Sequence, residues 1–110
     1  MIFDSDGTTT IVHQENATLK TFIENLLGGY DQIKSNHIIV NLFSFSELAT
    51  DDVMEFLEIS NKHRATKKSF VLVSERISYD DAPEELAIAP TVQEAKDIIE
   101  MEEIERDLGL

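Results

Sequence analysis

The sequence has no cysteine and no tryptophan, and its 110 residues include only four glycines and two prolines. Without cysteine the chain has no disulfide, no thiolate nucleophile and no cysteine-based zinc site. No stretch approaches the roughly 18 apolar residues that a membrane span needs, and the first residues lack the basic and apolar regions of a signal peptide. We therefore expect a cytoplasmic protein that does not insert into a membrane.

Positive charge is also scarce, because nine lysines and arginines stand against 22 acidic residues, for a net charge of −13. Residues 75–110 contain twelve acidic and three basic residues, so this third of the chain carries −9 of that charge. Such a surface repels phosphate backbones and anionic lipid heads, which disfavours direct binding to nucleic acid. It is either a solvated face that aids solubility or a surface for a basic protein partner.

The apolar pattern predicts four strands in a single domain. Two nearly continuous apolar runs, at 37–43 and 69–74, are typical of strands covered on both faces. Residues 1–3 and 8–14 flank an Asp-Gly turn signal and predict a hairpin. A short apolar stretch at 86–89 is stopped by a proline and precedes the last helix.

Three helices are expected between and after these strands. The first starts at Asn16 or Thr18 and is ended or interrupted by Gly28-Gly29. The second runs from 51 to 64, and the third follows a capping Thr91. The order β-β-α-β-α-β-α predicts a mixed sheet with helices packed on it, an α/β layered fold that covers residues 1–110 as one domain.

No arrangement of residues indicates catalysis or metal binding. His13, His37 and His63 lie about 25 residues apart on separate predicted elements, so no two have the spacing of metal ligands on one helix. The glycines match no phosphate-binding loop, and adjacent acids on a helix diverge by about 100° rather than forming a dyad. We expect no catalytic residue, no metal site and no cofactor.

A family resemblance begins at Ile38. A buried strand, IIVNLF, is followed by LATDDV at the opening of a helix, then by the strand SFVLVS and the closing LAIAPTVQEAKDII. Over residues 38–100 this layout resembles the STAS domain, the family of bacterial anti-sigma factor antagonists and sulfate-transporter cytoplasmic tails. In that family an Asp-Ser-Ser-Gly-Leu motif opens the helix. Asn41 stands where the family usually has a strand Asp.

The resemblance implies a stand-alone regulatory module that binds a protein partner, for example an anti-sigma-type kinase. Thr50 takes the position of the serine that is phosphorylated in anti-sigma antagonists, which makes it a candidate phosphoacceptor. The chain departs from the motif at Ala49, which replaces Asp, and at Asp52, which replaces Gly. The alternative is that Thr50 is only the N-cap of the helix.

The expected contact surface is the loop 44–49 and the helix that follows it. Phe43 and Phe45 flank the strand exit, and Met54 and Ile59 fall off the inward stripe of the helix, so an exposed apolar centre ringed by acids is predicted. Burial of these side chains is the alternative. The partner-binding residues proposed on this basis are Phe45, Glu47, Asp51, Asp52, Met54, Glu55 and Glu58.

The last helix contains two apolar stripes. Val92, Ala95, Ile98 and Ile99 share one face, whereas Met101, Ile104 and Leu108 lie on another. One straight helix cannot bury both stripes against the same sheet. We expect the acidic segment 100–110 to bend, or to protrude and offer its stripe to another chain, for example in a homodimer; fraying into solvent is the alternative.

Two other functions stay open at this stage. Short proteins of this general appearance are sometimes named ribonuclease Z, which suggests an accessory protein in tRNA processing; the chain lacks the clustered histidines that this metallo-hydrolase needs. The second is a module that binds a small molecule or lipid-like ligand between its helices.

Overall fold

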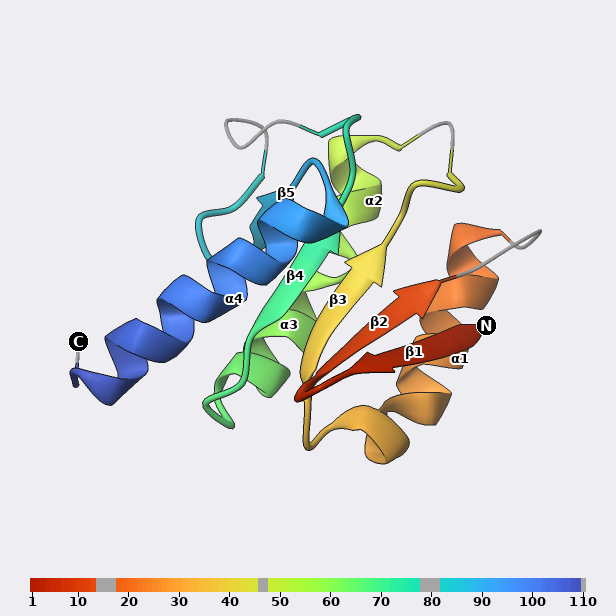
Figure 1. Ribbon diagram of the computed structural model, residues 1–110. Helices are drawn as coiled ribbons and strands as arrows, with labels where there is room; N and C mark the ends of the chain where they lie inside the picture. The colour runs from red at the N-terminus through yellow and green to blue at the C-terminus, as the bar shows by residue number, and fades with distance from the viewer. Residues whose placement is uncertain (14–17, 46–47, 78–81, 110) are drawn as a thin grey trace.

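A five-stranded mixed sheet with helices on both faces forms the protein (Figure 1). The computed structural model describes residues 1–13, 18–45, 48–77 and 82–109. The strands are β1 (Ile2–Asp6), β2 (Thr9–His13), β3 (His37–Asn41), β4 (Phe70–Val73) and β5 (Ala87–Ala89). The helices are α1 (Leu19–Ile33), α2 (Thr50–Met54), α3 (Leu57–Arg64) and α4 (Val92–Asp107). The predicted α/β class is confirmed. Against the predicted order of elements, the middle helix is divided in two, and β5 adds a fifth strand between β4 and α4.

The strands lie side by side in the order in which they occur in the chain. β1 and β2 form the predicted antiparallel hairpin, in which Ile2 lies opposite His13 and Asp6 opposite Thr9. Gly7 in its turn has a φ of 62°, a left-handed conformation that glycine adopts without steric cost. The remaining pairs, β2–β3, β3–β4 and β4–β5, are all parallel.

The sheet separates two apolar cores. α1, α2 and α3 cover one face and α4 covers the other (Figure 1). Alternate side chains of β3 enter different cores: Ile38 and Val40 pack beneath α1 and α3, whereas Ile39 packs beneath α4. This two-sided burial explains why β3 and β4 are nearly continuous in apolar residues.

α1 begins as predicted but continues further. The Thr18 hydroxyl accepts the N–H of Thr21 at 3.2 Å and caps the helix, whereas the alternative cap, Asn16, lies outside the described residues. The prediction that Gly28-Gly29 ends or interrupts α1 is wrong, because buried side chains on both sides of the pair hold the helix against the sheet. A Cβ at Gly29 would lie only 2.8 Å from the ring of Phe3, so glycine lets β1 pack closely here.

The predicted helix 51–64 is interrupted at Glu55 and Phe56. α2 ends at Met54, and Phe56 serves as the N-cap residue of α3. Phe56 is fully buried, with its ring edge-on to Phe22 at a centroid distance of 6.4 Å. The interruption therefore coincides with an aromatic anchor between the middle helix and α1.

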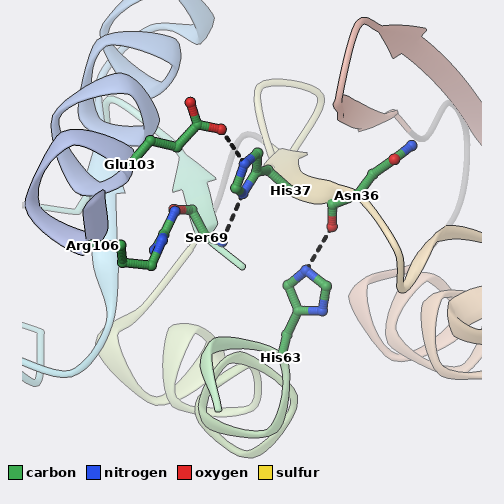
Figure 2. A network of polar contacts seen from close by, with 6 residues as sticks. All are labelled: Asn36, His37, His63, Ser69, Glu103 and Arg106. Carbon is green, nitrogen blue, oxygen red and sulfur yellow. Dashed lines mark hydrogen bonds and ion pairs between the residues drawn. The ribbon is translucent and has the colours of Figure 1, made fainter. Parts of the chain in front are cut away.

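Polar contacts hold the second half of α4 against the sheet (Figure 2). Nδ1 of His37 accepts the backbone N–H of Ser69 at 3.0 Å, so the ring proton resides on Nε2 and is donated to the carboxylate of Glu103. Arg106 donates to the hydroxyl of Ser69 at 3.0 Å. These contacts join α4 to the first residue of β3 and to the residue preceding β4.

His63 forms a second buried polar site, between α3 and α1. Its Nε2 donates to the backbone carbonyl of Asn36 at 2.8 Å, because a carbonyl can only accept (Figure 2). Nδ1 must then accept the hydroxyl proton of Tyr30, 2.7 Å away. Burial lowers the pKa of His63 against the smaller opposing effect of the Asn36 carbonyl, with minor lowering by nearby His37 and Lys68. The ring is therefore held neutral.

This site predicts how stability depends on pH. Because the folded pKa of His63 lies below its usual value of 6.5, the unfolded chain binds the proton more strongly. The neutral ring of His63 therefore stabilises the fold fully above pH 6.5. This stabilisation is lost as the pH falls from 6.5 toward the folded pKa of His63. Urea unfolding between about pH 5 and 8 should show this loss in the wild type and a smaller one in His63→Leu.

Tyr30→Phe is the matched control. It removes the hydroxyl donor and should cost about 1–2 kcal/mol in the free energy of unfolding at every pH. It keeps the buried imidazole, and so it should keep the pH dependence. If His63→Leu kept the pH dependence of the wild type, His63 would not be the source of that dependence.

Candidate functional site

The surface around Thr50 lies at the carboxyl end of the parallel strands, where the chain leaves β3 and enters α2 (Figure 1). Thr50 is exposed and is the first residue of α2. The N-cap residue is Ala49, so the prediction of Thr50 as N-cap is wrong by one position. The reason is a contact three residues on: the carboxylate of Asp52 accepts the Ala49 N–H at 2.9 Å.

The strand exit itself is held by Asn41. Its side-chain oxygen accepts the N–H of Phe43 at 3.0 Å, which fixes the amide orientation. The amide nitrogen then donates to Nδ1 of His13 at 3.2 Å. Asn41 therefore positions the loop that leads to α2.

Carboxylates gather along α2 and the start of α3, and all of them except the half-buried Asp52 are exposed. Asp51 and Asp52 occupy the first turn of α2, as expected, where they face the positive end of the helix dipole. Glu55 follows α2, and Glu58 lies in the first turn of α3. Glu47, predicted to belong to the same surface, lies outside the described residues. Asp51, Glu55 and Glu58 form no ion pair within the described part of the chain.

The apolar centre of this surface is smaller than predicted. Phe43 is 51% exposed and Met54 is 42% exposed. Phe45 is half-buried, with its ring 5.5 Å from that of Phe22 in α1. Ile59 is only 5% exposed, so the expectation that it falls outside the buried stripe is wrong: α3 turns it into the core beneath α1.

A hollow of about 350 Å³ separates α1 from α2. A second one of about 180 Å³ continues between α1 and α3. We call the two together the α1–α2 groove; it is lined by Leu19, Lys20, Ile23, Glu24, Leu27, Tyr30, Asp52, Glu55, Glu58, Ile59 and Lys62. Glu55 lines both hollows, Asp52 lines the first and Glu58 the second, so three of the predicted contact acids line hollows that α1 also lines.

The contribution of α1 to this groove was not predicted. Leu19 and Ile23 belong to the apolar stripe of α1 but stay only half-buried. Their helical spacing in the sequence indicates that they face the core. Only the position of α2 in the structure shows that they are left partly uncovered.

A further hollow of about 210 Å³ lies at the carboxyl ends of β3 and β4. Phe43 and Phe45 line it from one loop and Ser74, Glu75 and Arg76 from the next. The carboxyl edge of a parallel sheet is where α/β folds usually bind ligands. Here it adjoins the exposed ring of Phe43, so this hollow extends the surface around Thr50.

The three histidines occupy separate surroundings. His13 contacts Asn41, His37 contacts Glu103, and His63 contacts Tyr30. Within the described ranges, no group of three or more His, Asp or Glu side chains is placed to hold a metal ion. None of the helices there combines the length and apolar character that crossing a bilayer requires.

α4 leaves its second stripe in solvent. The helix runs without a break from Val92 to Asp107, and its first stripe packs under the sheet through Ala95 and Ile99. The residues of the second stripe are strongly exposed: Met101 is 62%, Ile104 54% and Leu108 68% exposed. α4 is helical through Asp107, and the second stripe lies exposed on it.

No protein-family model and no curated protein matches this chain. Two open surfaces stand out in the described part of the chain: the α1–α2 groove, lined by acidic, basic and apolar side chains, and the apolar stripe on α4.

Proposed function

We propose that this chain is a non-catalytic, STAS-like regulatory module that binds a protein partner through the surface around Thr50. One observation carries the proposal. Asp52, Glu55 and Glu58, which the sequence assigned to partner binding, line the two hollows of the α1–α2 groove together with apolar side chains of α1. The exposed Met54 follows Asp52 in the same helix, α2.

The chemistry of the groove favours a protein rather than a nucleic acid. Its first hollow is lined by the apolar side chains of Leu19 and Ile23 and by charged side chains, and protein interfaces combine apolar and polar groups in this way. Because the acids of α2 and α3 lack ion-pair partners in the described structure, lysines or arginines on a partner would gain contacts there. The same charges repel phosphate.

The buried imidazoles support a non-catalytic role. Both ring nitrogens of His37 and both of His63 form hydrogen bonds within the protein. Neither ring has a free nitrogen for a substrate. Their contacts explain them as structural groups that connect helices to the sheet.

Reversing charge in the groove should abolish partner binding. Met54→Arg with Glu55→Lys replaces an exposed apolar side chain and a rim carboxylate by cations. We expect partners captured from a lysate by the wild type to be lost from this variant. Quantitative mass spectrometry of the captured proteins measures the effect.

The matched control is Glu84→Lys with Glu85→Lys, two exposed residues that precede β5. It introduces a similar change of charge away from the groove and should retain the partners. Identical partners in all three samples, with circular dichroism showing that the variants fold, would count against the groove.

Thr50 is the proposed point of regulation. Its hydroxyl is exposed at the start of α2, and a phosphate there would add up to about two negative charges beside Asp51 and Asp52. Mass spectrometry of the protein recovered from its own cells should detect phosphate on Thr50, with Thr50→Ala as the control. Protein that carries no phosphate at Thr50 under any growth condition would remove the switch and leave only the contact surface.

Ligand binding is a second candidate, and the size of the groove favours it. About 350 Å³ lies at the lower end of small-molecule sites. Native mass spectrometry of gently purified protein should then show a bound mass that denaturation releases and that Ile23→Arg prevents. A bare protein mass after purification from its own cells would exclude a tightly bound ligand.

A further inference from the structure

The second stripe of α4 is an exposed apolar face with acids on both sides. Met101, Ile104 and Leu108 follow one another at intervals of three and four residues, so they share a narrow line along the helix. Glu105 flanks this line on one side, and Glu100 and Asp107 flank it on the other. All three acids are exposed, and none forms an ion pair within the described residues.

The opposite face of the same segment is fixed to the body of the protein. Glu103 contacts His37, and Arg106 contacts Ser69 (Figure 2). Glu102 forms a two-pronged ion pair with Arg64 of α3, with N···O distances of 2.8 and 3.4 Å. The stripe is thus displayed on a helix whose orientation is already set, which reduces the entropy cost of binding.

The spacing of the stripe is that of a helix–helix seam. In heptad terms Met101, Ile104 and Leu108 fall at positions a, d and a, and the flanking Glu100, Glu105 and Asp107 fall at g, e and g. The flanking positions set the choice of partner by charge. Because all three are acidic, a second copy of this chain packed on the stripe would bring like charges together.

We propose that this stripe docks a basic amphipathic helix of another protein, with aliphatic residues against Met101, Ile104 and Leu108 and lysines or arginines against the flanking acids. The surface is separate from the one around Thr50, because α4 covers the opposite face of the sheet (Figure 1). The module then has two independent contact faces, both selective for positive charge.

A synthetic peptide tests the proposal. It has roughly 20 residues, enough to form an isolated helix, with leucine at a and d and lysine at e and g so that it does not pair with itself. Fluorescence anisotropy with the full chain measures its affinity. Met101→Ala with Ile104→Ala should weaken binding about tenfold or more, because it removes apolar area from the seam. Glu100→Lys with Glu105→Lys should weaken it at least several-fold.

Two controls separate this site from general attraction to an acidic protein. Glu84→Lys with Glu85→Lys reverses the same number of charges elsewhere and should leave the affinity within about twofold. Met54→Arg with Glu55→Lys, which disables the other proposed surface, should also leave it unchanged. Equal loss of affinity in the stripe and control variants, or failure of the wild type to bind the peptide, would overturn the proposal. So would a dimer in sedimentation analysis that Ile104→Ala dissociates, because a second copy would then occupy the stripe.

Discussion

The middle strands of the sheet have to be covered on both faces, and this constraint shapes the rest of the molecule. Ile38 and Val40 of β3 point to one core and Ile39 to the other, and β4 is buried along its whole length. A parallel pair of this kind requires helices in two layers. α1, α2 and α3 supply one layer, so α4 must supply the other. The groove beside α1 and the outer side of α4 are among the surfaces that this arrangement leaves open in the described part of the chain.

α4 meets this requirement with two kinds of chemistry. Its first half buries apolar side chains such as Ala95 and Ile99, whereas its second half faces the sheet with Glu103 and Arg106. A carboxylate facing a buried histidine is an uncommon way to hold a helix, because charged groups seldom approach a core without a partner. Because Glu103 and Arg106 make the contacts with the sheet, the apolar residues in the second half of α4 face solvent.

The layers of the fold and most of the order of its elements could be predicted from the sequence because the pattern is local: apolar runs in β3 and β4, a capping Thr18 and a capping Thr91. The strand β5 is missing from the predicted order because it has only three residues. Misassignments occurred where tertiary contacts outweighed local preference. Gly28-Gly29 lies inside α1 because buried neighbours hold the helix there, and Ile59 is buried because α3 begins anew after Phe56.

For the site, the acids of α2 were predictable from the helix start, but the groove depends on the separation of α1 and α2, which no residue pattern encodes. It could not be predicted either that Glu102 and Glu103 face the body of the protein, because apolar periodicity gives no indication that a polar stripe faces inward.

The division of α4 has a consequence for how the helix responds to its surroundings. Its first half is held by apolar burial, which weakens on cooling and is strengthened by excluded solutes. Its second half is held in part by the ion pair Arg64–Glu102, which is partly accessible and loses strength as ionic strength rises. The two ends of one helix therefore depend on different solvent variables. Rising ionic strength acts mainly on the end that carries the exposed stripe, whereas cooling acts mainly on the end that is docked by apolar contacts.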